Sequence, residues 1–339
     1  MQRNDISFIQ GWEQKAGDDF FQQQRQRADT AKLWQCENFY KMMIKLAFEM
    51  DTATGALSFP DKKGSKLQVL DLCMAPGGFS AALLTLNPTA SISGISLPRA
   101  KGAHKLLLPF GEKDPRVCVL FTDITMLAAE CGVDMEEIPE DHPDAVRLNS
   151  LRPYSDKNYD LVLCDGQVLR SHTRESYRDQ CEPTRLTNAQ LILALQRIKS
   201  GGTLIILLHR LDTFHSMMLI RSFCKLATVE LFKPKRAHAI RSSFYMVAKD
   251  VKPHSAEAEI ALEKYKSLWH NATFGDGVGV GKSAKDDVDR IDFPAVLEEF
   301  GPKLAALGRG IWKIQADALE KAPFMPNKPP PKYYNNQGR

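Results

Sequence analysis

A glycine-rich turn between an apolar run and a helical pattern is the clearest place for chemistry in this sequence. Its residues, from the end of the run to the start of the helix, are Asp71-Leu-Cys-Met-Ala75-Pro76-Gly77-Gly78-Phe79-Ser80. Gly77 and Gly78 let the backbone turn tightly and approach a ligand, because neither carries a Cβ. The free N–H groups at the start of the helix suit a carboxylate. The turn is therefore predicted to bind a ligand, and a plain strand-to-helix turn is the alternative.

Two further polar residues stand at the ends of apolar runs. Asp165 follows Tyr159–Cys164, and His209 follows Gly202–Leu208. A carboxylate at the carboxyl end of a strand points to the edge where α/β sheets bind ligands, whereas a turn-forming Asp-Gly pair is the alternative. A histidine in such a place can act as a general base near neutral pH, or it can merely cap the strand.

Alternating strand and helix patterns over residues 67–249 must position these side chains. The seven runs of strand length are Leu67–Leu72, Ala90–Ile95, Val117–Phe121, Tyr159–Cys164, Gly202–Leu208, Thr228–Leu231 and Phe244–Ala248. Helical patterns lie at Phe79–Leu86, Thr184–Lys199 and Thr213–Leu226. This alternation predicts an α/β fold, with a mostly parallel sheet covered by helices on both faces. The short basic stretch Lys233–Arg241 before the last run predicts a terminal antiparallel hairpin.

The turn resembles the signature of the FtsJ-like methyltransferases, which methylate ribose 2′-hydroxyls of ribosomal RNA and of mRNA caps. The similarity rests on Asp71–Ser80 and extends over residues 35–250. It implies a Rossmann-like class I methyltransferase sheet of seven strands. It also implies S-adenosylmethionine as the cofactor, bound across the turn by Asp71, Ala75, Pro76, Gly77, Gly78 and Phe79.

The resemblance implies a Lys–Asp–Lys–Glu catalytic set, which this sequence keeps only in part. An aromatic pair precedes Lys41 as it precedes the first family lysine, with an exposed helix lysine as the alternative, and Asp165 matches the aspartate. Ungapped matching puts Leu207 in the place of the second lysine and Ser243 in the place of the glutamate. His209 projects to the same side of its strand as Leu207, because strand side chains alternate. His209 is therefore the candidate for the missing base.

On the cofactor side the match is also mixed. Ser96 ends the second strand, where the family has an acidic residue for the ribose hydroxyls, and Asp123 matches the position that contacts the adenine amino group. Asp165 belongs to this set as well. No pair among the seven cysteines has CxxC spacing, so no metal site is expected. Cys118, like other cysteines in apolar runs, is expected to be buried.

The rest of the chain is expected to surround this core. Helical spacing predicts an N-terminal helical extension over 1–50 and a C-terminal one over 251–325, on either side of a methyltransferase domain over 51–250. The Pro- and Asn-rich tail 326–339 is expected to be disordered. The net charge of +4 permits contact with RNA without requiring it. No apolar run approaches the roughly 20 residues of a membrane span, and no apolar signal core is present, so we expect a cytoplasmic or nuclear protein.

Three functions are compatible with these patterns. The first is a methyltransferase with an altered catalytic set, acting on RNA or on a small molecule. The second is a catalytically inactive protein that binds S-adenosylmethionine or RNA on the same fold, and the third is a different enzyme built on this scaffold. Leu207 cannot take a proton from a ribose hydroxyl, and losing such a group costs roughly two to four orders of magnitude in rate. Alignment of the reactants supplies much of the acceleration in methyl transfer, so a better nucleophile, or His209 as the base, would restore activity.

Overall fold

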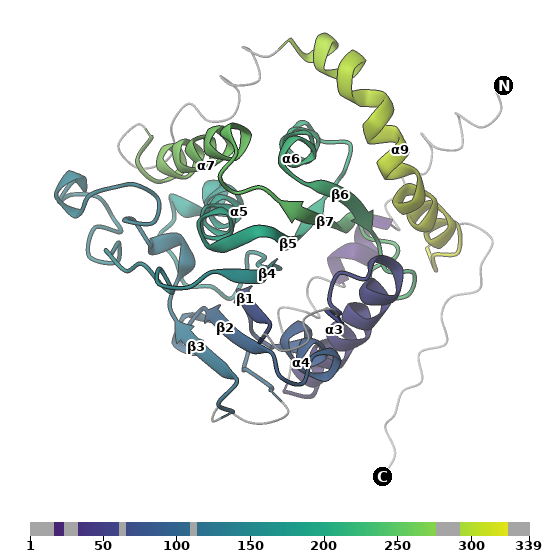
Figure 1. Cartoon of the computed structure of the whole chain (residues 1–339), viewed down its shortest axis with the longest axis horizontal. Coiled ribbons are helices and arrows are strands. Elements are labelled where there is room, and N and C mark those ends of the chain that lie inside the picture. The colour runs from purple at the N-terminus through teal and green to yellow at the C-terminus, as the bar shows by residue number, and fades with distance from the viewer. Residues whose placement is uncertain (1–16, 24–32, 61–65, 109–113, 276–291, 325–339) are drawn as a thin grey trace.

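A seven-stranded sheet forms the centre of the computed structural model, which describes residues 17–23, 33–60, 66–108, 114–275 and 292–324 (Figure 1). The strands lie in the order β3-β2-β1-β4-β5-β7-β6. Their bounds are β1 Gln68–Leu72, β2 Ser91–Ser96, β3 Val117–Phe121, β4 Tyr159–Cys164, β5 Ile198–His209, β6 Thr228–Phe232 and β7 Ser243–Val251. All neighbouring strands are parallel except β7, which lies antiparallel between β5 and β6. The predicted sheet with its antiparallel hairpin is therefore confirmed.

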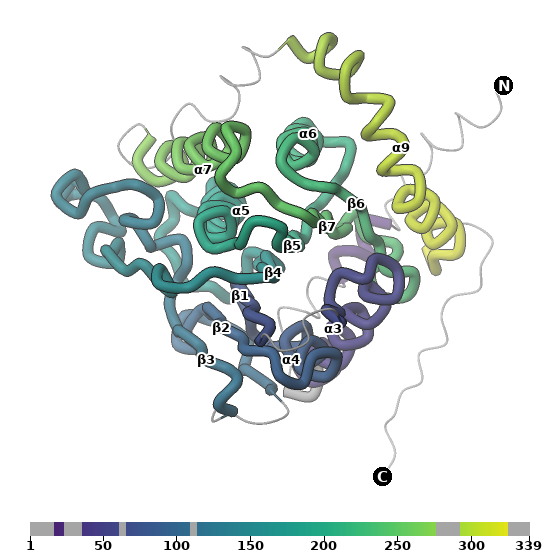
Figure 2. The backbone as a smooth tube through the Cα atoms, viewed as in Figure 1, coloured from purple at the N-terminus to yellow at the C-terminus, as the bar shows by residue number. Residues whose placement is uncertain are grey.

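Helices cover both faces of this sheet, as Figures 1 and 2 show. On one face lie α3 (Leu33–Thr54) and α4 (Gly78–Leu86), and on the other lie α5 (Arg178–Arg197), α6 (Phe214–Leu226) and α7 (Ala256–Phe274). Each face has its own apolar core, because β1, β4 and β5 bury side chains on both sides. Three short 3₁₀ helices stand in the connections: η1 (Arg99–Lys101), η2 (Ile124–Met126) and η3 (Met135–Glu137).

Strand β3 forms one edge of the sheet and explains one wrong prediction. Cys118 lies in an apolar run and was expected to be buried, but it is exposed. An edge strand has a neighbour on one side only, and β3 is only partly covered by helices, so its side chains remain half-exposed or exposed.

Helix α5 begins at Arg178, before the predicted start at Thr184. Its first turns carry Arg178 and Glu182, which do not follow the apolar spacing of a helix, and Pro183. Both charged side chains are nonetheless buried, with 1% and 2% of their surfaces exposed. Ion pairing to the rest of the fold, and not an apolar face, therefore holds this end of the helix in place.

One long helix, α9 (Phe293–Glu320), forms the last described part of the C-terminal extension and contains Gly308. Gly308 does not break the helix. A Cβ at this position would lie 2.5 Å from Leu211 Cδ2, so the glycine allows close packing. Helix α9 runs beside the edge strand β6 (Figure 1), which protects that edge from pairing with another strand.

None of the helices that the structure describes combines the length and the apolar character needed to cross a bilayer. The tail 326–339, predicted to be disordered, lies outside the described residues. The division into two extensions and a central domain stays a prediction.

Candidate functional site

The glycine turn connects the carboxyl end of β1 to the first turn of α4. Gly77 has φ 95°, a left-handed conformation that a residue with a Cβ rarely adopts. Gly78 lies against α3, where a Cβ would stand 2.5 Å from Met43 Cβ and 2.8 Å from the Tyr40 carbonyl oxygen. The two glycines therefore have separate tasks, because Gly77 makes the turn and Gly78 lets α3 pack against α4.

Asp71 stabilises this turn from the interior of the protein. It is 3% exposed, and Ser80 Oγ donates a hydrogen bond to Asp71 Oδ2 across the start of α4. Burial raises the pKa of Asp71 to about 7, although the Ser80 hydroxyl favours its ionised form. Asp71 does not line the adjacent cavity, and neither do Pro76, Gly77, Gly78 and Phe79. These predicted cofactor residues therefore form the turn beneath the cavity, while Ala75 lines the cavity itself.

A cavity of about 1020 Å³ lies over the carboxyl ends of the parallel strands. Of the predicted cofactor residues, Ala75, Ser96, Asp123 and Asp165 line it, each from the end of a different strand. Pockets for single ligands usually measure about 300–1,000 Å³. The volume is thus at the upper end of that range and offers room for a nucleoside cofactor and a second molecule.

Asp165 follows β4 and lines the cavity together with Leu207 and Tyr245. Tyr245 donates a hydrogen bond from its hydroxyl to Asp165 Oδ1 at 3.0 Å. Burial raises the pKa of Asp165 to about 7, and the charge of Asp71 adds to the effect, while the Tyr245 hydroxyl opposes it. Leu207 stands opposite Tyr245 in the β5–β7 register and supplies no positive charge. Asp165 therefore faces the cavity without the cation that the family lysine would provide.

His209 lines the same cavity as Leu207 and stands opposite Ser243 in the β5–β7 register. Its Nε2 atom lies 2.8 Å from Gln167 Oε1, which can only accept, so Nε2 carries the proton and Nδ1 is left with a lone pair. Partial burial lowers the pKa of His209, and the charge of Arg241 adds to this. A neutral imidazole with one free nitrogen can therefore act as a base at this place.

Lys41 does not join these residues. It is exposed on α3 and is not among the residues that line the cavity, although Phe39 and Met42 of the same helix are. Successive residues of a helix are about 100° apart, so the face that brings Met42 to the cavity turns Lys41 away from it. The expected first lysine of the catalytic set is therefore not placed beside Asp165.

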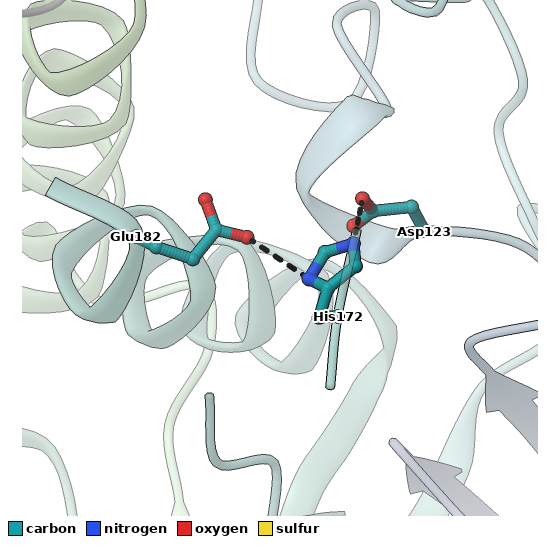
Figure 3. A group of neighbouring side chains, drawn as sticks. All are labelled: Asp123, His172 and Glu182. Carbon is teal, nitrogen blue, oxygen red and sulfur yellow. Dashed lines mark ion pairs between the residues drawn. The ribbon is translucent and has the colours of Figure 1, made fainter. Parts of the chain in front are cut away.

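Asp123 belongs to a buried polar cluster that sequence reasoning missed. Figure 3 shows the His172 ring between the carboxylates of Asp123 and Glu182, with Nε2 3.3 Å from Asp123 Oδ2 and Nδ1 3.8 Å from Glu182 Oε1. Arg178 pairs with both carboxylates, at 3.0 Å from Asp123 and 2.5 Å from Glu182. Three such ligand groups could suit a metal ion, but the Arg178 guanidinium already balances the two carboxylates, so we interpret the cluster as an ion-paired support.

This support determines the charge of Asp123. Burial opposes its ionisation, but the contact with His172 and the charge of Arg178 outweigh burial and hold the pKa of Asp123 well below its usual range. The ionised carboxylate faces the cavity at the end of β3, where a hydrogen-bond acceptor for an amino group is expected. The spacing of Arg178 and Glu182 at i, i+4 was the only signal for this cluster in the sequence, and this spacing does not indicate that Asp123 belongs to the cluster.

Lys233, which begins the basic stretch Lys233–Arg241, stabilises one wall of the cavity. It is buried, and its Nζ donates to the carbonyl oxygens of Arg241 at 2.5 Å and Ser243 at 2.8 Å. Burial lowers the pKa of Lys233 to about 8. The contacts hold the segment between β6 and β7, from which His238 and Arg241 line the cavity.

A protein-family model matches more than half of the chain. The family model described as FtsJ-like methyltransferase matches residues 42–251. No curated protein matches the chain significantly. Among solved structures, a ribosomal RNA methyltransferase from Plasmodium falciparum is 19% identical, with 61% of this chain and 96% of that chain covered and a TM-score of 0.38. Human methyltransferase-like protein 13 in complex with SAH is 11% identical, with coverages of 74% and 98% and a TM-score of 0.37. An rRNA methylase from Streptococcus thermophilus is 13% identical, with coverages of 60% and 95% and a TM-score of 0.35.

The family match spans the sheet from α3 to the end of β7 and includes the glycine turn, Asp123 and Asp165. It covers well over half of the 339 residues. The chain therefore belongs to the FtsJ-like methyltransferase family.

Proposed function

We propose that the protein transfers the methyl group of S-adenosylmethionine to a hydroxyl acceptor bound in the same cavity. The observation that carries the proposal is that Ala75, Ser96, Asp123 and Asp165 line one cavity with room for two molecules. Family membership supports methyl transfer as the reaction class.

The residues of the donor half fit the chemical groups of this cofactor. Asp123 is ionised and offers an acceptor to the adenine amino group, and Ser96 offers one hydroxyl to the ribose. Asp165 offers a carboxylate to the positive end of the cofactor. When bound, S-adenosylmethionine supplies a methyl group activated by the sulfonium charge.

The acceptor half lacks the lysine and glutamate that act in the family's ribose chemistry. Leu207 and Ser243 occupy those positions and line the cavity. We propose that His209 Nδ1 takes the hydroxyl proton instead, since Nε2 is engaged with Gln167. A positioned base of this kind contributes about 10²–10⁴-fold to a rate. RNA is the acceptor typical of the family.

A second candidate function is binding of S-adenosylmethionine without catalysis. Leu207, an apolar side chain at the place of the central family lysine, is the observation that favours it. The two functions differ in one measurable property, because only the first produces S-adenosylhomocysteine in the presence of an acceptor.

Calorimetric titration with S-adenosylmethionine tests the donor site. We expect one site per chain, and an affinity reduced at least tenfold in Asp123→Asn, because the charged hydrogen bond to the amino group is lost. Asp134→Asn is the matched control, since Asp134 is exposed immediately before η3 and does not line the cavity. The melting temperature of each variant separates loss of binding from loss of folding. An unchanged affinity in folded Asp123→Asn would remove the proposed adenine contact, and absence of binding in the parent protein would refute the function.

A further inference from the structure

The acceptor half of the cavity is completed by segments from both ends of the described chain. Phe21 of the helix over 17–23 and Gln315 and Leu319 of α9 line the same cavity as Asp165. All three lie outside the residues 42–251 matched by the family model. The cavity therefore has walls that the family domain alone does not provide.

Aromatic packing holds these two segments together. The Phe324 ring, which follows α9, lies 5.1 Å from the Phe20 ring and 5.7 Å from the Phe21 ring, measured between centroids. Helix α9 is in turn anchored on α6 by the ion pair between Arg221 and Glu299. The helix over 17–23 and α9 thus form one packed wall of the cavity, which is called the roof below.

The roof and α3 together give the cavity an apolar lining. Phe21 and Leu319 contribute from the roof, and Phe39, Met42 and Leu46 contribute from α3. Aromatic and aliphatic side chains around a concave site favour a planar apolar ligand, because such a ligand loses little hydration on burial.

Part of the cavity wall is cationic. Arg241 lines the cavity, and among the residues that the structure describes its guanidinium forms no ion pair. Burial disfavours protonation of both His209 and His238, and the positive charges of Arg241 and Lys233 add to this effect. An anionic group on the ligand would balance this charge.

We propose that the acceptor is a small aromatic compound with a ring hydroxyl and an anionic substituent, held between the roof and Arg241. This inference rests on the proposed function and specifies its substrate class. A phenolic hydroxyl, with a pKa near 10, is far more acidic than an aliphatic one, so the neutral His209 is an adequate base where the family lysine is missing.

Methyl transfer from S-adenosylmethionine to this acceptor requires no further reactant. His209 Nδ1 accepts the hydroxyl proton, and the phenolic oxygen forms a bond to the methyl carbon. The carbon–sulfur bond breaks with its electron pair going to sulfur, which leaves as the neutral thioether of S-adenosylhomocysteine. The proton on His209 then passes to water.

Formation of S-adenosylhomocysteine by the full chain, measured with a panel of hydroxybenzoates and hydroxycinnamates, tests the inference. Phenol and benzoate are the matched probes without the anionic group and without the hydroxyl. At least one hydroxylated acid should accelerate product formation, and benzoate should not. In Arg241→Ala, KM for that acid should rise about tenfold or more while KM for phenol stays unchanged, as loss of a charged hydrogen bond predicts.

A pair of variants on α9 tests the roof. Leu319→Trp should fill the acceptor half and abolish turnover of the acid, with the affinity for S-adenosylmethionine unchanged within twofold. Leu297→Trp is the control on the same helix, because Leu297 is 42% exposed and does not line the cavity. Normal turnover in Leu319→Trp would overturn the inference.

The outcomes also separate this inference from the function on which it rests. If the protein binds S-adenosylmethionine and methylates total RNA but no member of the panel, the substrate class is wrong and the methyltransferase function stands. If the protein binds S-adenosylmethionine and methylates nothing, the substrate class is equally refuted. If it does not bind S-adenosylmethionine, both proposals fall.

Discussion

Binding of S-adenosylmethionine should weaken as the pH falls through 7, because Asp165 must be ionised to attract the sulfonium. Burial raises the pKa of this carboxyl to about 7 in the absence of a ligand. About nine tenths of the molecules then carry the charge at pH 8 and about one tenth at pH 6. If S-adenosylmethionine binds only when Asp165 is ionised, its dissociation constant should be about tenfold higher at pH 6 than at pH 8.

S-adenosylhomocysteine provides the internal reference, since it keeps every group of the cofactor except the methyl and the sulfonium charge. The ratio of the two dissociation constants, measured by calorimetry at pH 6, 7 and 8 and constant ionic strength, removes effects on the shared groups. We expect preference for the charged donor to fall about tenfold from pH 8 to pH 6 in the parent protein. In Asp165→Asn the ratio should not change with pH.

Two results would refute this reasoning. A ratio that stays constant between pH 6 and 8 in the parent protein would show that Asp165 does not sense the sulfonium. A pH dependence that survives in Asp165→Asn would assign the titration to another group.

Three predictions concern the stability of the fold. Folding raises the pKa of Asp71 from 3.8 to about 7, so the native state binds a proton that the unfolded state lacks between about pH 4 and 7. The contribution of Asp71 to the free energy of unfolding should therefore rise by about 1 kcal/mol when the pH is lowered from 8 to 6. Urea unfolding at pH 8 and pH 6 measures this change, and Asp71→Asn should remove the part that Asp71 contributes. Gly78→Ala should destabilise the protein by about 1–3 kcal/mol, because the new Cβ would stand 2.5 Å from Met43 Cβ; thermal unfolding tests this, and an unchanged melting temperature contradicts the packing described. Arg178→Met should cost about 3–5 kcal/mol in the same assay, since two buried carboxylates lose their cation, and a loss below about 1 kcal/mol would mean that the cluster is not held by this ion pair.

The sheet could be predicted from the sequence because its strands are buried on both faces. Continuous apolar runs such as Tyr159–Cys164 are then the physical requirement for a central strand, and they stand out from their surroundings. The glycine turn was predictable for a related reason. Gly77 needs a positive φ and Gly78 needs close approach, so the sequence is constrained at both positions by the backbone alone.

Features that depend on tertiary contacts were not predictable. Lys41 matched a family position by its neighbours, but its direction depends on how α3 packs against α4. The early start of α5 is stabilised by the ion pair of Arg178 with Asp123, which is far away in the sequence. The roof requires Phe21 and Leu319, which are far apart in the sequence, to line one cavity, and no local sequence pattern indicates this.

Acceptor-dependent formation of S-adenosylhomocysteine, compared between the parent protein and His209→Ala, tests whether the protein transfers methyl groups with His209 as the base. Product should appear only with an acceptor. The rate should fall about 10²–10⁴-fold in His209→Ala, while the affinity for S-adenosylmethionine is unchanged. Equal rates in the two proteins, or binding of S-adenosylmethionine with no product from any RNA or hydroxylated acceptor, would contradict this prediction.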